Sequence, residues 1–328
     1  MAEQPGKGGQ LMRTLIIPCG GNTYIDGQPQ YLNRHPNGKL LFERCMEGIY
    51  PERFDRIIAV ILQQDVDAYA ADQKLIEEFS GKYPLEIIML PQRTSGPADT
   101  VYYGITQGDV QGTIVVKDVD NYVRISTEQI ATDNFVAGLD LNRWNRDIHN
   151  LRNKSFLILN EQGSLLDVIE KQFKSDVISL GLYGFKNAED FKNAYTKLNN
   201  SGYPIDRLYL SHVISYLIGF SGKVFQYVPA TAFENWSDDR HWKDLQADYA
   251  LRFLDLDDIW NSQKLLSLQQ HGATFIGFTA KNRQDANTAI QALEQAGIHL
   301  MDVIYNCPWS QTRIIMDCNT TPNMIAKM

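Results

Sequence analysis

Two aspartates, Asp118 and Asp120, end the apolar segment Val115-Val116-Lys117-Asp118-Val119-Asp120-Asn121. Residues two apart on an extended backbone point to the same side, so both carboxylates are expected to face one point. Mg²⁺ prefers such oxygen ligands and is typically held by one or two carboxylates together with substrate phosphates. The pair therefore predicts a Mg²⁺ (or Mn²⁺) site. The alternative is two turn aspartates that cap the end of a strand.

A glycine loop near the N-terminus suits a phosphate group. The apolar residues 15–17 lead into Pro18, Cys19, Gly20 and Gly21. Glycine lets the main chain approach a ligand closely, and backbone N–H groups supply positive potential. The stretch 19–31 contains no Lys or Arg. A phosphate bound here therefore needs its positive charge from another part of the chain.

Two further segments carry groups that suit a polar ligand. Arg93, Thr94, Ser95 and Gly96 form a turn before a helix, where a hydroxyl can hydrogen-bond a ligand edge and the glycine lets the backbone approach a flat ring. The alternative is a helix N-cap and its turn. Lys171 can bind a phosphate as a point charge, or it can simply face solvent.

Short apolar strands alternate with amphipathic helices, and this alternation predicts the elements that position the candidate residues. We expect an α/β fold with a doubly wound, mostly parallel sheet and helices on both faces. Ligands of such sheets bind at the carboxyl ends of strands, where residues 18–21 and 118–120 both fall. The predicted strands are 14–18, 56–62, 85–90, 112–117, 154–159 and 177–185, and the predicted helices are 40–49, 66–79, 100–108 and 188–198.

A second, smaller α/β unit is predicted from residue 247 onward. Its predicted strands are 251–256, 273–278 and 313–316, and its predicted helices are 262–271 and 285–296. At about 80 residues this unit is small for an α/β domain and is expected to lean on the first unit for burial. The predicted limits are a flexible N-terminus at 1–12, a first domain at 13–246 and a second domain at 247–328.

The composition excludes several classes of protein. The chain has 328 residues, of which 44% are hydrophobic and 21% charged, as in ordinary soluble globular proteins. No apolar run is long enough to span a membrane, and the polar residues 1–10 are unlike a signal peptide. The four cysteines lack zinc-type spacing, which favours reduced thiols in the cytoplasm. A net charge of -8 argues against nucleic acid, whose binding rests on basic patches.

Taken in order, these segments resemble the sugar-nucleotide pyrophosphorylase family of nucleotidyltransferases, which have a GT-A-like fold. The resemblance covers residues 14–245 and is greatest to members from bacterial capsule and surface-polysaccharide clusters. It rests on Pro29-Gln30-Tyr31-Leu32, Gly38-Lys39-Leu40-Leu41, Thr94-Ser95-Gly96, Glu170-Lys171-Gln172, Gly181-Leu182-Tyr183-Gly184-Phe185 and Trp236-Ser237-Asp238. It implies nucleotide contacts from residues 18–21, Gln30 and residues 93–96, catalytic roles for Asp118, Asp120 and Lys171, and a metal site at Asp118, Asp120 and Asp238.

The sequence departs from this family at two cations. The loop arginine is replaced in the region Asn22-Thr23-Tyr24, and the lysine of the Pro-Lys segment is Gln30. Each cation is expected to stabilise the transition state by about a few kcal/mol, because phosphate charge develops beside it. Arg34, Lys39 and Arg93 are the nearby residues that would replace them.

The second unit resembles the haloacid-dehalogenase-like (HAD) phosphatases. The matching segments are Phe253-Leu254-Asp255-Leu256-Asp257-Asp258, Phe278-Thr279-Ala280 and Arg313-Ile314-Ile315-Met316-Asp317. The resemblance implies that Asp255 is a nucleophile, that Asp257 is a general acid, and that both hold Mg²⁺ with Asp317. Asp258 replaces the glycine of the family, and the segment before the next helix is short. A truncated domain with a scaffolding role is therefore the alternative.

Three functions follow from these resemblances. The first is a cytoplasmic nucleotidyltransferase that joins an NTP to a phosphorylated sugar or similar small phosphate and releases pyrophosphate, for capsule or surface-polysaccharide precursors. It has no nucleic-acid or membrane partner, and assembly into a homo-oligomer is left open. The second is a non-catalytic nucleotide-binding or regulatory relative, and the third is a phosphatase that acts through Asp255. We favour the first, because the carboxylates are retained and only two cations are replaced.

Overall fold

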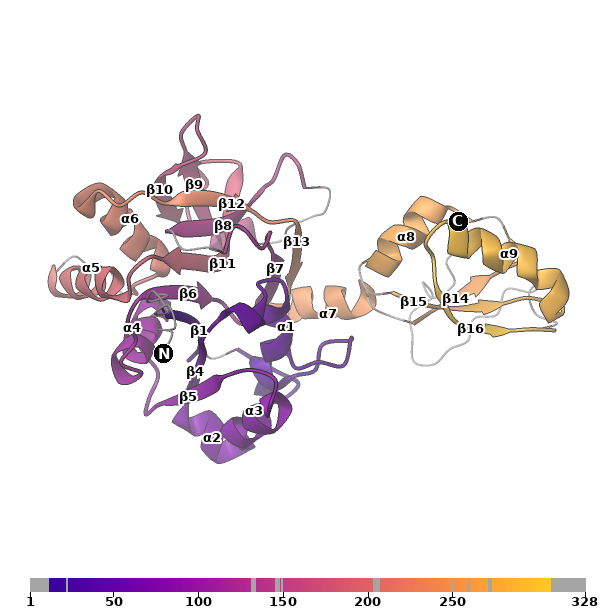
Figure 1. The fold of residues 1–328 in the computed structure, drawn as a ribbon, viewed down its shortest axis with the longest axis horizontal. Coiled ribbons are helices and arrows are strands. Elements are labelled where there is room, and N and C mark those ends of the chain that lie inside the picture. Colours follow the sequence, from indigo (N-terminus) through magenta and orange to yellow (C-terminus); the bar gives the residue numbers. More distant parts are fainter. Residues whose placement is uncertain are drawn as a thin grey trace, which may run out of the picture. The chain divides into compact units, whose positions relative to one another are not determined.

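The computed structural model describes residues 12–21, 23–130, 134–144, 148, 150–202, 207–248, 251–258, 260–270 and 273–307 (Figure 1). The chain divides into two compact units. The first comprises Met1–Asn33 and Leu40–Asp238, and the second comprises Arg34–Lys39 and Asp239–Met328. The strand predicted at 313–316 and the candidate ligand Asp317 lie outside the described residues. The predicted domain limits at 12 and 246 stay predictions.

A large sheet forms the centre of the first unit. Its main path runs in the order β10-β9-β11-β6-β1-β4-β5, and β8 pairs with both β11 and β12. Strand β4 is buried along nearly its whole length, as expected for a central strand covered on both faces. The strands are β1 (Arg13–Cys19), β4 (Arg56–Leu62), β5 (Leu85–Leu90), β6 (Thr113–Lys117), β8 (Phe135–Asp140), β9 (Ser155–Leu159), β10 (Leu165–Glu170), β11 (Val177–Phe185) and β12 (Gln226–Pro229).

The sheet is parallel in one half and antiparallel in the other. Strands β6, β1, β4 and β5 are parallel to one another, and β12 is parallel to β8. Strand β11 is antiparallel to β6, β8 and β9, and β10 is antiparallel to β9. The predicted α/β class is confirmed, whereas the antiparallel half differs from the prediction. Residues 160–164 join β9 to β10, and so short a link makes a hairpin and not a parallel crossover.

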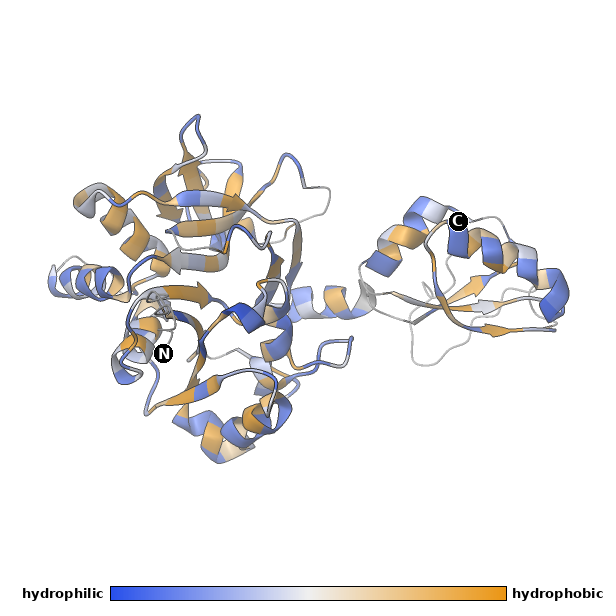
Figure 2. Cartoon of the chain, in the orientation of Figure 1, coloured by the Kyte–Doolittle hydropathy of each residue, from blue (hydrophilic) through white to orange (hydrophobic). Residues whose placement is uncertain are grey.

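Helices cover the sheet on both faces. Ile16 and Ile58 point into a core shared with α4, α5 and α6, while Leu15 and Ile57 are also fully buried and face the other way. Figure 1 shows α4 and α1 on opposite sides of β1, and Figure 2 shows mainly apolar strands between helices with polar outer faces. The helices are α1 (Leu41–Glu47), α2 (Gln63–Tyr69), α3 (Ala71–Phe79), α4 (Pro97–Gln107), α5 (Ala188–Asn200) and α6 (Leu210–Ser221).

One predicted helix, 66–79, is two helices. Ala70 has a φ of 51°, which ends α2 and begins α3, because a left-handed residue cannot continue a right-handed helix.

Short elements complete the unit. They are β2 (Tyr24–Ile25), β3 (Gln28–Pro29), β7 (Asn121–Arg124), β13 (Ala232–Asn235) and the 3-10 turns η1 (Gln30–Leu32), η2 (Pro51–Arg53) and η3 (Leu151–Asn153).

The second unit has its own small sheet and core. Strands β14, β15 and β16 are parallel neighbours, and Leu254, Leu265, Phe275 and Ile298 are fully buried among them. Strand β16 was not predicted. The elements are α7 (Asp239–Asp248), β14 (Leu251–Asp255), α8 (Ser262–Gln270), β15 (Thr274–Phe278), α9 (Arg283–Gln295) and β16 (Leu300–Ile304).

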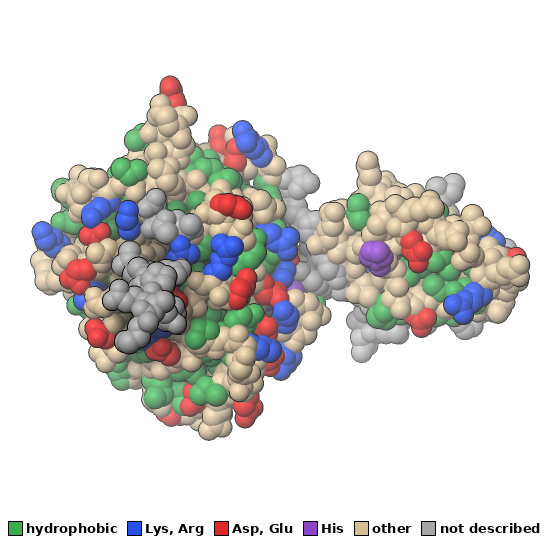
Figure 3. Space-filling model, viewed as in Figure 1, with side chains coloured by type: hydrophobic (Ala, Val, Ile, Leu, Met, Phe, Trp, Pro, Cys, Tyr) green, Lys and Arg blue, Asp and Glu red, His purple; other side chains and the backbone are tan. Residues whose placement is uncertain are grey.

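The described surface is of mixed charge. On the face drawn in Figure 3, Lys and Arg side chains are interspersed with Asp and Glu over the first unit. None of the helices in the described part of the chain combines the length and the apolar character that a membrane span requires.

Candidate nucleotide and phosphate site

A buried lysine shapes the turn that carries the candidate carboxylates. Lys117, the last residue of β6, is fully buried, and its Nζ donates to the backbone oxygen of Asp118 at 2.6 Å. The same ammonium donates to the backbone oxygen and the Oδ1 of Asn121 at 2.9 and 2.7 Å. Burial lowers the pKa of Lys117, although neighbouring acidic groups oppose this shift. Three hydrogen bonds from one ammonium fix the turn from Asp118 to Asn121, a role that the sequence had not assigned to Lys117.

Asp118 lies against the backbone of β11. Its N–H donates to the oxygen of Gly181 at 2.8 Å, and Gly181 has a φ of +70°. A Cβ on Gly181 would lie 2.3 Å from Oδ2 of Asp118, so only glycine leaves room for the carboxylate. Burial, and to a smaller extent the negative charge of Asp120, raises the pKa of Asp118 to about 7. A divalent cation would relieve this crowding of negative charge.

The carboxylate pair fits Mg²⁺, which needs one or two carboxylates when phosphates complete its shell. Oδ1 of Asp120 accepts a hydrogen bond from Nδ2 of Asn121 at 2.8 Å, which restricts the orientation of this carboxylate. Within the described ranges there is no group of three or more His, Cys, Asp or Glu side chains that could hold a metal ion. Oδ2 of Asp238 accepts a hydrogen bond from Asn150 at 2.7 Å. Two carboxylates are enough for this chemistry, and Asp118, Asp120 and Asp238 as metal ligands stay predictions.

A buried tryptophan, through its indole and its backbone, joins the carboxylate turn to Gln30 in η1. Trp236 is fully buried, its Nε1 donates to the oxygen of Val119 at 3.0 Å, and its backbone N–H donates to the oxygen of Asp120 at 3.1 Å. Nε2 of Gln30 donates to the carbonyl oxygen of Trp236. Three segments that are far apart in the sequence thus meet at one residue.

The side chain of Gln30 lies in the interior, although we had assigned it to nucleotide contact. It is 3% exposed, and its amide is held by Trp236. A neutral amide can be buried here because its N–H finds a carbonyl partner, whereas the family's lysine would place a charge in the same space.

Replacing Gln30 with lysine, the residue of the family, is therefore expected to destabilise the protein by about 1–3 kcal/mol and not to raise turnover. Thermal unfolding measures the effect. Gln30→Met is the matched control, because it fills similar volume without a charge and isolates the lost hydrogen bond. A Gln30→Lys protein with higher turnover and unchanged melting temperature would contradict the buried placement.

The glycine loop lies beside the turn that precedes α4. A Cβ on Gly20 would lie 2.8 Å from Leu90 Cδ1 and 3.2 Å from Thr100 Oγ1. Oγ1 of Thr94 lies 2.6 Å from that same Thr100 hydroxyl. The end of β1 and the following Gly20 therefore lie close to the N-terminal turn of α4, and a side chain at position 20 would not fit between them.

Cys19, the last residue of β1, is buried, and burial raises the pKa of its thiol well above the usual value.

The polar groups of the 93–96 turn are used mainly within the fold. The N–H and Oγ of Ser95 both donate to Oδ2 of Asp99, at 3.0 and 3.1 Å. A Cβ on Gly96 would lie 2.4 Å from the oxygen of Leu208, so this glycine allows close packing on residues 207–208. These contacts agree with the alternative stated above, in which the segment forms the turn and cap at the start of a helix. Ligand contact by Thr94, Ser95 and Gly96 stays a prediction.

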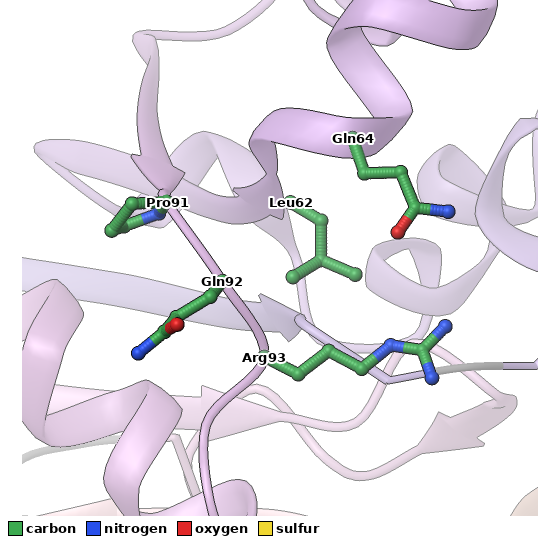
Figure 4. Close-up of a pocket in the computed structure, with 5 residues that line it drawn as sticks. All are labelled: Leu62, Gln64, Pro91, Gln92 and Arg93. Carbon is green, nitrogen blue, oxygen red and sulfur yellow. The ribbon is translucent and has the colours of Figure 1, made fainter.

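A cavity of about 520 Å³ opens at the carboxyl ends of β4 and β5, lined by Leu62, Gln64, Pro91, Gln92 and Arg93. Figure 4 shows the side chains of Gln64 and Arg93 on the same side of it, with Gln92 pointing the other way. An amide and a guanidinium beside an apolar leucine suit a flat, polar ligand such as a nucleobase.

Arg93 also reaches the loop that lacks a cation. Tyr24 donates to Oδ1 of the buried Asp65 at 2.7 Å, and Tyr31 donates to its Oδ2 at 3.0 Å. Burial and the hydrogen bond to Asp65 raise the pKa of Tyr24, while the nearby Arg93 guanidinium acts in the opposite direction. The Arg93 guanidinium is thus close enough to influence Tyr24, which belongs to the region where the family's loop arginine is replaced. Arg34, by contrast, donates to the oxygen of Gly38 at 2.8 Å within its own loop.

A second basic region lies after β10. Lys171 has a φ of +54°, and its Nζ donates to the hydroxyl of Tyr209 at 2.5 Å and lies 4.4 Å from the ring centre. The guanidinium of Arg207 lies 5.2 Å from the same ring. A left-handed lysine is uncommon, and such strain gathers at functional sites. Sequence reasoning singled out Lys171 and missed both Arg207 and Tyr209, because nothing in the sequence shows that the three meet.

In the second unit, the Asp-x-Asp pair is used to join two strand ends. The Asp257 carboxylate accepts from Thr279 Oγ1 at 2.9 and 3.0 Å and from the Ala280 N–H at 2.8 Å, and it pairs with Lys281 Nζ at 3.2 Å. Its own N–H donates to Asp255 Oδ1 at 2.9 Å. These contacts support the scaffolding alternative, while Asp257 as general acid and both aspartates as metal ligands, with Asp255 as nucleophile, stay predictions.

Comparisons with known proteins show the fold. No family model matches the chain, and no curated protein matches it. Among solved structures, the nucleoside-diphosphate-sugar pyrophosphorylase from Vibrio cholerae is 21% identical with a TM-score of 0.56, over 70% of this chain and 98% of that one. The inositol-1-phosphate CTP transferase from T. maritima is 12% identical with a TM-score of 0.53, over 71% and 92%. The chain thus shares the α/β fold of these enzymes, while the resemblance of its second unit to HAD phosphatases stays a prediction.

Proposed function

We propose that this protein is a nucleotidyltransferase that joins an NTP to a phosphorylated sugar, or a similar small phosphate, and releases pyrophosphate. The observation that supports the proposal is the meeting of three segments at Trp236, which donates to the oxygens of Val119 and Asp120 and accepts from Gln30 in η1, the turn that follows the glycine loop and β2–β3. The shared fold with two nucleotidyltransferases supports it.

Each group of described residues has a separate role in this reaction. The base enters the cavity beside Gln64 and Arg93, and the backbone of the glycine loop faces the phosphates. Asp118 and Asp120 would hold Mg²⁺, which when bound neutralises phosphate charge and orients the α-phosphate. Lys171 binds the phosphate of the acceptor. An acceptor phosphate oxygen forms a bond to the α-phosphorus as the bond to pyrophosphate breaks, a reaction that needs positioning and charge neutralisation.

The role in capsule or surface-polysaccharide precursor synthesis, in the cytoplasm, belongs to the same proposal. It rests on the resemblance of residues 35–39 and 117–121 to members from such clusters.

The test is pyrophosphate release by the full chain over a panel of NTPs and sugar 1-phosphates with Mg²⁺. We expect one pairing to turn over at about 1–10³ s⁻¹. The second candidate is a non-catalytic nucleotide-binding relative, which the buried Gln30 favours. The change in melting temperature on addition of the same NTPs distinguishes it from the enzyme. Shifts without turnover would establish that candidate, and neither shift nor turnover would overturn both.

A further inference from the structure

A buried carboxylate connects the hairpin after the glycine loop to the helix beside the cavity. Asp65 lies in the first turn of α2, directly after the cavity residue Gln64, and it is 1% exposed. A carboxylate is almost never buried unless its oxygens have partners. Here Oδ1 accepts from Tyr24 at 2.7 Å and Oδ2 accepts from Tyr31 at 3.0 Å. Because this carboxylate is closed to solvent, any effect of Asp65 on a ligand passes through its neighbours.

The two tyrosines lie at the two ends of the hairpin segment. Tyr24 begins β2 and Tyr31 lies in η1, so one carboxylate holds both ends of residues 24–31. The ring of Tyr24 also packs near that of Tyr69, the last residue of α2, with 6.2 Å between the ring centres. Burial raises the pKa of both Tyr24 and Tyr31, so both phenols stay protonated as donors at neutral pH. The hairpin is thereby fixed to α2.

The turn η1 is held on its other side by the carboxylate turn. Gln30, next to Tyr31, donates to the carbonyl oxygen of Trp236. Trp236 in turn donates to the oxygens of Val119 and Asp120. Neighbouring residues of η1 thus connect to α2 and to the carboxylate turn. If the link to α2 is lost, residues 24–31 stay attached to the carboxylate turn but lose their fixed position beside the cavity.

We propose that Asp65 is a positioning residue that holds the glycine loop at the distance from the cavity that an NTP requires. An NTP with its base in the cavity and its phosphates at the glycine loop spans both features, whereas an acceptor phosphate at Lys171 does not depend on that distance. This inference rests on the proposed function and deepens it, since it names the residue that matches the loop to the nucleotide. Asp65 is therefore expected to affect the NTP and not the acceptor.

The experiment compares the steady-state kinetics of Asp65→Ala, Tyr24→Phe and the double variant in the full chain. Asp65→Ala is expected to raise KM for the NTP by about 10–50-fold and to leave KM for the acceptor within about twofold, because two hydrogen bonds to one carboxylate are lost. Tyr24→Phe is expected to raise KM for the NTP by about 3–10-fold. The double variant should be no worse than Asp65→Ala, since both changes remove the same bond.

Two results would overturn the inference while leaving the proposed function intact. One is a wild-type KM for the NTP in Asp65→Ala, or an equal rise in the KM values of NTP and acceptor. The other is an effect of the double variant that equals the sum of the two single effects. Asp65→Asn keeps one acceptor oxygen and is the milder change if Asp65→Ala does not fold. It is expected to raise KM for the NTP by about 3–10-fold, and an unchanged value would also count against Asp65.

Ser215→Ala is the matched control. The hydroxyl of Ser215, on α6, donates to Oδ1 of Asp167, on β10, at 2.5 Å. Its loss removes another hydroxyl–carboxylate hydrogen bond of the first unit, so it is expected to lower the melting temperature while KM for the NTP stays within about twofold of wild type. A rise in KM equal to that of Tyr24→Phe would mean that a general loss of stability explains both variants, and the role of Asp65 would be rejected.

Calorimetric titration with ATP, CTP, GTP and UTP in the presence of Mg²⁺ gives a readout that does not depend on turnover. For the NTP that wild type binds, Asp65→Ala is expected to weaken binding by at least about tenfold, and Ser215→Ala is expected to leave it unchanged. If wild type binds an NTP but turns over no substrate, the proposed function fails and this comparison alone decides the role of Asp65. Equal binding by wild type and Asp65→Ala, or no binding of any NTP by wild type, would overturn the inference.

Discussion

Replacing Asp118 with asparagine is expected to lower kcat for pyrophosphate release by at least about 10³-fold while the protein stays folded. Asparagine keeps the shape that fits against Gly181 but removes the charge that a divalent cation requires. Steady-state release over a Mg²⁺ titration measures the loss. Glu161→Gln, on the exposed turn between β9 and β10, is the control and should keep wild-type turnover. Turnover in Asp118→Asn close to that of wild type would remove Asp118 from the site.

The same replacement is expected to stabilise the protein at pH 8 in the absence of metal. The pKa of Asp118 is raised to about 7 by burial and by Asp120, so the folded protein holds this proton more tightly than the unfolded chain. Stability from this group therefore falls as pH rises from about 4 to about 7, and asparagine removes that cost. Melting temperatures at pH 5 and pH 8 test this, with the advantage of Asp118→Asn largest at pH 8. A variant that is less stable than wild type at both pH values would contradict it.

The elements that could be predicted are those whose pattern is local. Strands β4, β5 and β11 begin and end at the residues predicted from their apolar runs. Strand β8 and helix α6 were not predicted, and the antiparallel pairing of β11 could not be read from alternation alone. Which strands become neighbours is decided by packing over long distances, and a periodic pattern in one segment does not contain that information.

The candidate site, like the fold, could be predicted from the sequence only in part. The spacing of Asp118 and Asp120 predicted a pair of facing carboxylates, and the charge of Asp120 contributes, after burial, to the raised pKa of Asp118. The burial of Gln30 could not be predicted, because its partner Trp236 is 206 residues away. In the sequence, Trp236 was noted only as part of the segment that contains Asp238, whereas in the structure its indole and its backbone together connect the carboxylate turn and Gln30. A residue's type indicates its chemistry, but tertiary contacts decide whether that chemistry faces a ligand.

Replacing Trp236 with alanine is expected to destabilise the first unit by about 3–5 kcal/mol and to abolish measurable turnover. The side chain is fully buried, so its loss leaves a large cavity, and the carboxylate turn also loses its hydrogen bond from Nε1. Trp236→Phe keeps most of the apolar volume and removes only that donor. We expect it to lose about 1 kcal/mol and to lower kcat more than it raises KM, because the turn from Asp118 to Asp120 becomes less fixed.

The matched control for Trp236→Phe lies in the second unit. Trp260 also donates from Nε1 to a backbone oxygen, that of Asp255 at 2.8 Å. Trp260→Phe removes an equivalent hydrogen bond from a strand end outside the first unit, so pyrophosphate release should be unchanged. Thermal unfolding and steady-state kinetics of both variants separate a general loss of stability from a loss at the site. Equal kcat for the two variants would mean that the indole of Trp236 holds the fold together without positioning the carboxylates.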